Sequence, residues 1–338
     1  MEIKEYIREF TLRDIVRVRN PRVVAFGGGT GLSAILRGLK KYTHRLTAVV
    51  TMADDGGSSG MLREELGMLP PGDIRNCILS LADDENVMKE LFNYRFENGR
   101  LKGHSFGNLF LAAMSGISSD FYDAVRRTSD VLQITGRVLP VTLDEMTLVG
   151  TLKSGQVVEG ESHIPEVVKT TQSGIDFIRL KKPAGALSET LDAIKEADII
   201  TFGPGSLYTS LIPHLLVDGV EEAIAESHAK KFYIGNLMTQ PGETTGYTQE
   251  DHIRAIIKHC RIKDNPLFKY VVANNGEFGT QALLRYKEHG AVPVEIGRKI
   301  ENYQYTCGNY IVQDMGKVRH DADEVAKRIF EIYMDGDF

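Results

Sequence analysis

The sequence predicts an α/β protein in which one doubly wound, mostly parallel sheet carries helices on both faces. The first observation is a short β-branched run at residues 22–26, followed directly by glycines and then by apolar residues at helical spacing. The second is that strand-like and helix-like segments alternate again from residue 198 to residue 273. The third is that no linker rich in Pro, Gly or Ser divides the chain. Together these observations favour one domain over two.

The composition is that of a folded globular protein. Of the 338 residues, 42% are apolar and 25% are charged, and 40 basic against 46 acidic residues give a net charge of −6. An acidic surface repels nucleic acid and anionic membranes, so neither is expected as a partner. The sequence has no apolar run of the roughly 18 residues that cross a membrane. It also lacks a signal-peptide pattern, and its three cysteines lie far apart, which favours the cytoplasm.

The chain divides into a short extension and one long domain. Residues 1–20 are expected to form a charged N-terminal extension, and residues 21–338 a single domain. After the first strand and helix, the apolar run at residues 46–52 predicts a second strand. Apolar runs at residues 198–202, 232–235 and 270–273 predict the later strands, each followed by a helix.

Two insertions are expected within this domain. Helical spacing interrupted by glycines predicts a helical insertion at about residues 73–133. Short alternating stretches joined by a turn at residues 153–155 predict a β-rich insertion with a hairpin at about residues 137–182.

The glycine-rich loop between the first strand and the first helix is the strongest candidate for an anion site. Gly28, Gly29, Thr30 and Gly31 place backbone N–H groups at a helix N-terminus, where they can hold a phosphate without a cationic side chain. Leu32 replaces the third glycine of the dinucleotide fingerprint, and no Lys follows as in a P-loop. A tight turn that needs glycine is the structural alternative.

Asp54 and Asp55 follow the second strand, at the edge where open parallel sheets bind ligands. A carboxylate there can accept from a ribose hydroxyl, hold Mg²⁺ or act as a base, although a capped turn also explains the pair. As residues of a ligand crevice, both are expected to matter for function rather than for stability. The GxSxG pattern at residues 56–60 is not placed as a hydrolase elbow, because two aspartates and two glycines separate its Ser from the strand.

Further polar residues stand at the starts of later helices and at the ends of later strands. Asp73 is expected to be a helix N-cap, and Arg75 in the same segment can clamp a phosphate or carboxylate. Gly205 and Ser206 repeat the arrangement of the first glycine loop in the second half of the chain. Neutral groups that can hydrogen-bond a ligand in these segments are contributed by Asn76, Asn108, Asn236, Thr239 and Gln240.

Other candidate residues have structural explanations. His252 and His259 lie seven positions apart on a predicted helix, which is too far for joint metal ligation, so no metal site is expected there. Asp321 begins a capping box, so it is expected to cap the last helix.

Five segments, in this order along the chain, resemble the YvcK-type gluconeogenesis factors, which share a superfamily with CofD, the 2-phospho-L-lactate transferase: residues 27–33, 53–60, 70–76, 203–209 and 238–244. The resemblance covers about residues 22–334 and implies a Rossmann-like fold. It implies a cytoplasmic factor that binds UDP-sugars, notably UDP-N-acetylglucosamine, and that cells need for normal shape and wall synthesis on gluconeogenic carbon sources. It also implies that Tyr286 and Arg319 contact the nucleotide sugar. Cell-wall-synthesis proteins and a second copy of the chain are the macromolecular partners it leaves open.

Two enzymatic alternatives remain at this stage. The first is a CofD-like phosphotransferase that uses Asp54 or Asp55 to hold Mg²⁺. CofD-like enzymes usually continue the glycine loop with Gly and Lys, whereas this chain has Leu32 and Ser33. The second is an NAD-dependent oxidoreductase, against which the missing third glycine counts. No catalytic residue is therefore assigned, and Mg²⁺ is the one cofactor considered.

Overall fold

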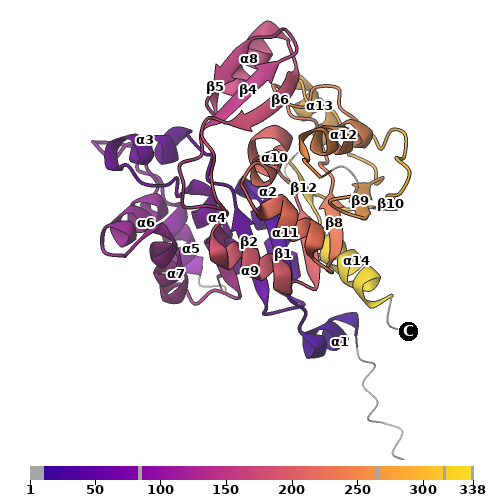
Figure 1. Ribbon diagram of the computed structural model, residues 1–338, viewed down its shortest axis with the longest axis horizontal. Helices are drawn as coiled ribbons and strands as arrows, with labels where there is room; N and C mark the ends of the chain where they lie inside the picture. The colour runs from indigo at the N-terminus through magenta and orange to yellow at the C-terminus, as the bar shows by residue number, and fades with distance from the viewer. Residues whose placement is uncertain (1–10, 83–85, 263–265, 315–316, 336–338) are drawn as a thin grey trace, which may run out of the picture.

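The computed structural model describes residues 11–82, 86–262, 266–314 and 317–335. Within these ranges, seven strands form one parallel sheet in the order β10-β9-β8-β7-β1-β2-β3 (Figure 1). They are β1 (Val23–Gly27), β2 (Leu46–Val50), β3 (Arg137–Pro140), β7 (Ile199–Phe202), β8 (Lys230–Ile234), β9 (Tyr270–Asn274) and β10 (Gln304–Gly308).

The strand order is that of a Rossmann-like sheet, and this confirms the predicted fold class. Counted along the chain, the strands run third, second, first and then fourth to seventh across the sheet. The order reverses between β1 and β7, which pair in parallel. Open α/β sheets bind ligands outside the carboxyl ends of the strands at such a switch point.

Helices cover both faces of this sheet. α2 packs against α4 and α14 on one face, and α9 packs against α11 on the other (Figure 1). In chain order the helices of the described residues are α1 (Leu12–Arg19), α2 (Gly29–Leu39), α3 (Gly57–Leu66), α4 (Gly72–Leu81), α5 (Asn86–Asn93), α6 (Phe106–Gly116), α7 (Phe121–Val131), α8 (His163–Thr171), α9 (Ser188–Glu196), the π-helix η2 (Leu207–Leu211), α10 (Ile212–Leu215), α11 (Val220–Glu226), α12 (Gln249–His259), α13 (Thr280–Glu288) and α14 (Ala322–Met334).

The central strands are apolar along their whole length because both sheet faces are covered. Every residue of β1, β2 and β7 is buried. Across the switch point, Phe26 of β1 stacks on Phe202 of β7 with ring centroids 4.8 Å apart. This core holds the strand ends, and the loops that follow them, in fixed positions.

A smaller antiparallel sheet stands above the carboxyl edge of the main sheet (Figure 1). It consists of β4 (Leu148–Leu152), β5 (Val157–Glu159) and β6 (Ile175–Leu180), and the predicted hairpin joins β4 to β5. The β-rich insertion was expected to begin near residue 137, but β3 at that position pairs in parallel with β2. The insertion therefore begins at β4, and β3 is an edge strand of the main sheet.

The helical addition is also shorter than the expected span of residues 73–133. α4 packs against α2 and so belongs to the helical layer of the main sheet. α5, α6 and α7 follow it and pack on one another.

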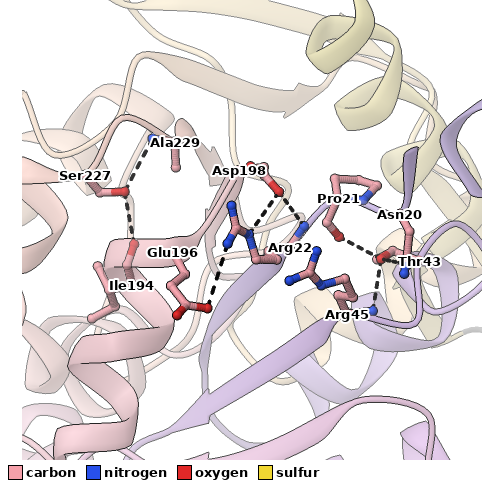
Figure 2. Close-up of polar contacts among 10 residues, drawn as sticks. All are labelled: Asn20, Pro21, Arg22, Thr43, Arg45, Ile194, Glu196, Asp198, Ser227 and Ala229. Carbon is pink, nitrogen blue, oxygen red and sulfur yellow. Dashed lines mark hydrogen bonds and ion pairs between the residues drawn. The ribbon is translucent and has the colours of Figure 1, made fainter. Parts of the chain in front are cut away.

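Polar side chains close the amino end of the sheet (Figure 2). The Asp198 carboxylate before β7 accepts the Arg22 backbone N–H at 2.7 Å, which ties the starts of β1 and β7 together. On the other side of β1, the Thr43 hydroxyl donates to the Pro21 carbonyl at 2.7 Å and accepts the Arg45 N–H at 3.0 Å. The polar groups at the amino end of the sheet thus bond to one another. The ligand-sized cavity described below lies at the carboxyl end.

The expected N-terminal extension is described from residue 11 onward. Thr11 and Asp14 form a capping box that begins α1, and Val16 is buried where α1 meets α14. This part of the extension therefore packs on the domain. Among the described residues, no helix is long and apolar enough to cross a membrane.

Candidate functional site

A cavity of about 1010 Å³ lies at the carboxyl ends of the central strands. It reaches from the β1, β2, β7 and β8 strand ends to α13 and to β12 (Lys317–His320), which pairs with β11 (Ile311–Asp314). Most of the candidate residues from the sequence line it: Gly28, Gly29, Thr30, Gly31, Asp54, Asn76, Gly205, Ser206, Asn236, Thr239, Gln240, Tyr286 and Arg319. Asp55, Arg75 and Asn108 do not.

The first glycine loop begins α2, and close packing explains its glycines. Gly28 is the N-cap of α2 with an extended backbone. A Cβ atom at Gly28 would lie 2.6 Å from Asp73 Oδ2, and one at Gly31 would lie 2.6 Å from the Pro204 carbonyl oxygen. Gly29 has φ of +57°, in the left-handed region that favours glycine. Glycine at these positions thus lets the segments that contain Asp73 and Pro204 approach the start of α2 closely.

Asp73 does not have the capping role that the sequence suggested. Pro71 is the N-cap of α4, and Asp73 lies inside the first turn of the helix, where its carboxyl group faces α2 from the cavity wall. Burial, and then the neighbouring Asp54, raise the pKa of Asp73 to about 7, although a hydrogen bond from the Gly29 backbone N–H acts in the opposite direction. The Ser59 hydroxyl of α3 accepts the Gly72 N–H at the start of this helix at 3.1 Å, so Asp73 is not used as its cap.

Asp54 and Asp55 have different environments. Asp54 lines the cavity, and its Oδ1 accepts the Gly56 N–H at 3.0 Å. Asp55 turns toward the small sheet, where its two carboxylate oxygens accept the backbone N–H groups of Glu161 at 2.7 Å and Ser162 at 2.9 Å. Asp55 is therefore an anchor for the β-rich insertion, and the expectation that it matters little for stability does not fit these contacts.

Glu161 is a cavity residue that the sequence did not indicate. It lies in the turn between β5 and α8, so the position of the small sheet places Glu161 on the cavity wall. Burial and the nearby carboxylates of Asp54, Glu243 and Asp55 raise the pKa of Glu161 to about 8. No local sequence signal could have found it, because its position depends on the contact with Asp55.

The acidic residues do not assemble into a metal site made by protein alone. Within the described ranges, no group of three or more His, Cys, Asp or Glu side chains is arranged to hold a metal ion. Asp55, the second half of the pair considered for Mg²⁺, already accepts two backbone N–H groups. Asp54 alone remains on the cavity wall, so any Mg²⁺ there would need ligand phosphates and water to complete its coordination.

Arg75 and Asn108 do not line the cavity, and they bond to residues of the helices around it. The Arg75 guanidinium donates to the Ser105 hydroxyl and, at 2.8 Å, to Asn76 Oδ1. Asn108 is buried and donates to the Ser58 hydroxyl at 3.1 Å, and Ser58 also contacts His104 Nδ1 at 3.1 Å. These contacts join α3, α4 and α6 and leave Asn76 as the member of the set that faces the cavity.

The second loop and the third strand end are tied together. Asn236 donates to the Gly205 carbonyl at 2.9 Å, and the Ser206 hydroxyl donates to Gln240 Oε1 at 2.8 Å. The Thr239 hydroxyl accepts the Val292 N–H at 3.0 Å. Within the described chain, Asn236 Oδ1 is buried without a hydrogen-bond partner. The side-chain amides of Asn236 and Gln240 thus line the cavity at the ends of β7 and β8, as the positions of these segments after two predicted strands suggested.

The part of the cavity formed by β12 is cationic. Lys317 and Arg319 are exposed on β12 and line the cavity, and neither side chain has a hydrogen-bond or ion-pair partner among the described residues. His320, the last residue of β12, donates from Nε2 to the Gly235 carbonyl oxygen at 3.0 Å, because a carbonyl oxygen can only accept. Burial lowers the pKa of His320 to about 4, so it is neutral at pH 7. The sequence analysis identified Arg319 but missed Lys317.

Several residues outside the cavity have the structural roles expected of them. His259 Nε2 accepts the Ile178 N–H at 2.9 Å, and its ring stacks on Phe177. His252 Nδ1 bonds to the Thr248 carbonyl within α12. Asp321 caps α14 by accepting two backbone N–H groups.

A Rossmann-order sheet with a ligand-sized cavity at its switch point defines an α/β protein that binds a small molecule. The sequence model of the family described as 2-phospho-L-lactate transferase CofD matches residues 23–311, and the chain belongs to this family.

Its relatives match over nearly the whole chain. A protein of Clostridium acetobutylicum named "Putative gluconeogenesis factor" is 52% identical over 94% of this chain and 71% of its own length. The "Gluconeogenesis factor" of Bacillus subtilis is 42% identical over 93% of this chain and 98% of its own. A solved structure of a UPF0052 family member from Bacillus halodurans is 42% identical, with a TM-score of 0.86, and covers 91% of this chain and 99% of that one.

Proposed function

We propose that this protein is a gluconeogenesis factor that binds a UDP-sugar, UDP-N-acetylglucosamine, in the cavity at the switch point. The observation that carries the proposal is that Lys317 and Arg319, two exposed cations without a partner among the described residues, line the same cavity as the polar ends of the central strands. Cationic side chains bind diphosphates through charge-assisted hydrogen bonds. The names of the relatives support the gluconeogenesis part of the proposal.

The size and the neutral groups of the cavity also suit a nucleotide sugar. Its volume of about 1010 Å³ is at the upper end of the range of roughly 300–1,000 Å³ that small-molecule sites occupy. Asn236, Thr239 and Gln240 offer amide and hydroxyl groups of the kind that hydrogen-bond a base or a sugar. The ring of Tyr286 can stack on a base.

The proposal includes a regulatory role in cell shape and wall synthesis on gluconeogenic carbon sources, with cell-wall-synthesis proteins as partners. It includes a cytoplasmic location, which is supported by three cysteines that are free in the described structure. A CofD-like phosphotransferase is the second candidate, and the family match and the carboxylate of Asp54 on the cavity wall favour it.

Calorimetric titration tests the ligand. UDP-N-acetylglucosamine is expected to bind with micromolar-range affinity, on the order of −8 kcal/mol. GDP and NAD(H) are titrated in parallel. Clear binding of NAD(H) without binding of any UDP-sugar would show that the protein is instead a dinucleotide-binding protein.

A second measurement separates a binding factor from a transferase. The protein is incubated with UDP-N-acetylglucosamine and Mg²⁺, and the nucleotide is then analysed by chromatography. Recovery of the intact nucleotide sugar supports a binding factor, whereas release of UDP or transfer of the sugar phosphate would favour the enzymatic candidate.

A further inference from the structure

The N-terminus of α2, the expected phosphate position, is already occupied by a carboxyl group of the protein. Asp73 accepts a hydrogen bond from the Gly29 backbone N–H. Its Oδ2 lies only 2.6 Å from the position that a Cβ atom on Gly28 would take. A phosphate bound at these amides would therefore lie against a carboxyl group.

A second carboxylate lies on the same side of the cavity. Asp54 Oδ2 lies 2.8 Å from the position of a Cβ atom on Gly72, at the start of α4. The N-termini of α2 and α4 thus both face an acidic side chain of the protein. Glu161 completes this acidic wall from above, next to Asp54.

An unpartnered hydroxyl group lies beside the same glycine loop. Thr51 lines the cavity with 3% of its surface exposed, and its Cγ2 is 3.0 Å from the Cβ position of Gly28. In the described part of the chain, Thr51 Oγ1 is buried and has no hydrogen-bond partner. A buried hydroxyl without a partner is energetically unfavourable, so a ligand group that hydrogen-bonds to it gains affinity.

The acidic side chains and the unpartnered cations of β12 come from different parts of the cavity. Asp54, Asp73 and Glu161 line it beside the end of β2 and the N-terminus of α2, whereas Lys317 and Arg319 line it on β12, next to the end of β8. Arg37, near the C-terminal end of α2, is a further cation of the lining. A diphosphate is stabilised by the unpartnered cations, whereas carboxyl and hydroxyl groups hydrogen-bond the hydroxyls of a sugar. These two parts of the cavity suit the two chemically different parts of one nucleotide sugar.

Resting on the proposed function, we infer that the acidic wall beside α2 is the sugar subsite, with Asp73 and Thr51 reading sugar hydroxyls, while the diphosphate binds Lys317 and Arg319. Asp73 is then a specificity-determining residue. The glycine loop is needed because it admits the Asp73 carboxyl group, and not because it holds a phosphate.

The test compares UDP-N-acetylglucosamine with UDP, which lacks the sugar, by calorimetry on wild-type protein, Asp73→Asn and Thr51→Val. Both substitutions keep the shape of the side chain, and thermal unfolding verifies that each variant is folded. We expect each variant to bind UDP-N-acetylglucosamine about tenfold or more weakly, as loss of a hydrogen bond to a buried polar group predicts. Binding of UDP is expected to stay within about threefold of wild type, because UDP lacks the sugar that the changed groups are inferred to contact.

Lys317→Gln is the matched control, since it removes one of the β12 charges inferred to bind the diphosphate. It is expected to weaken UDP and UDP-N-acetylglucosamine alike. If a phosphate lies at α2 instead, Asp73→Asn removes a repulsive charge and strengthens UDP binding, and this opposite sign overturns the inference. Equal losses for both ligands in Asp73→Asn and Thr51→Val also overturn it. Failure of wild-type protein to bind either ligand overturns the proposed function itself.

Discussion

The Tyr286 hydroxyl on α13 accepts a hydrogen bond from the Val318 backbone N–H on β12 at 3.2 Å and lies 3.4 Å from the Val318 carbonyl oxygen. Val318 stands between Lys317 and Arg319, the two cations that β12 contributes to the cavity wall. Tyr286 therefore fixes the strand that presents both charges, in addition to lining the cavity with its ring. A role in ligand contact, as the family resemblance implies, and a role in positioning the cations are compatible with this geometry.

Tyr286→Phe is expected to weaken UDP-N-acetylglucosamine binding by about 1 kcal/mol, the usual net value of one hydrogen bond. The ring remains, so the loss reports the contact with Val318. Calorimetry on this variant, on Arg319→Ala and on the double variant gives the coupling energy. Strict additivity of the two losses would show that Tyr286 acts independently of Arg319.

Arg319→Ala is expected to weaken UDP-sugar binding by about 1.5–3 kcal/mol, the range for a charged hydrogen-bond partner. Because the guanidinium has no hydrogen-bond or ion-pair partner among the described residues, unfolding stability should be unchanged. Arg100→Ala, at an exposed position that does not line the cavity, is the control. Wild-type affinity in the folded Arg319 variant would exclude this wall from the ligand site.

Asp55→Ala is expected to lower the free energy of unfolding by about 2 kcal/mol, because two backbone N–H groups lose a charged acceptor. Denaturant unfolding measures the loss. Asp192→Ala, at an exposed position on α9, is expected to change stability by less than about 0.5 kcal/mol. Unchanged stability in the Asp55 variant would mean that the β-rich insertion is held by its other contacts.

Gly28→Ala should affect ligand binding more than folding. The backbone at Gly28 is extended, so alanine causes no strain there, but its methyl group would displace the Asp73 carboxyl group. We expect a stability loss of about 1 kcal/mol and a clear loss of UDP-N-acetylglucosamine affinity. Gly116→Ala in α6 is the control, since a Cβ atom there meets nothing within 4 Å. Its stability should be equal to or greater than that of wild type. Unchanged affinity in Gly28→Ala would show that Asp73 is not required at its present position.

The unliganded protein is expected to lose stability as the pH rises from 7 to 9. The folded-state pKa of Glu161 is raised to about 8 and that of Glu243 to about 7, so the folded protein holds protons that the unfolded chain has already released. Their stabilising contribution is complete below pH 4 and is lost as the pH rises through these values. His214 and His320, whose pKa values are lowered to about 4, act in the opposite direction, but only below about pH 7.

Denaturant unfolding at several pH values measures this dependence. Glu161→Gln removes one titrating group and should make the stability curve flatter between pH 7 and 9. A wild-type curve that rises over this interval, or an unchanged slope in Glu161→Gln, would contradict the assignment of a neutral Glu161 in the folded protein.

Local patterns in the sequence are sufficient to predict the elements that set the fold. The β-branched run before Gly28 predicts β1 and the start of α2, because burial on both faces of a parallel strand leaves a continuous apolar signature. Arg137–Pro140 carries a weaker signal, and only its pairing with β2 shows that it belongs to the main sheet. The strand ends follow from the strands, so the loop residues that line the cavity can be named in advance.

Contacts between distant segments could not be predicted in this way. Glu161 enters the cavity because Asp55, 106 residues earlier, accepts its backbone N–H. The local sequence predicts a helix cap at Asp73 and a crevice carboxylate at Asp55. In the fold, Asp73 instead faces the start of α2 and Asp55 binds the backbone of the small sheet. The sequence around Lys317 gives no sign of a site, because Lys317 lines the cavity only once β12 has packed against the rest of the fold.

The cavity takes its acidic wall from residues 54–161, in the first half of the chain, and the cations Lys317 and Arg319 from β12, close to the last helix. During synthesis from the N-terminus, the acidic wall emerges long before these cations. If the proposed nucleotide sugar needs both, a nascent or truncated chain cannot use it as a template for folding. Ligand binding is possible only after nearly all of the long-range pairing is complete, so the ligand stabilises the finished protein and no earlier intermediate.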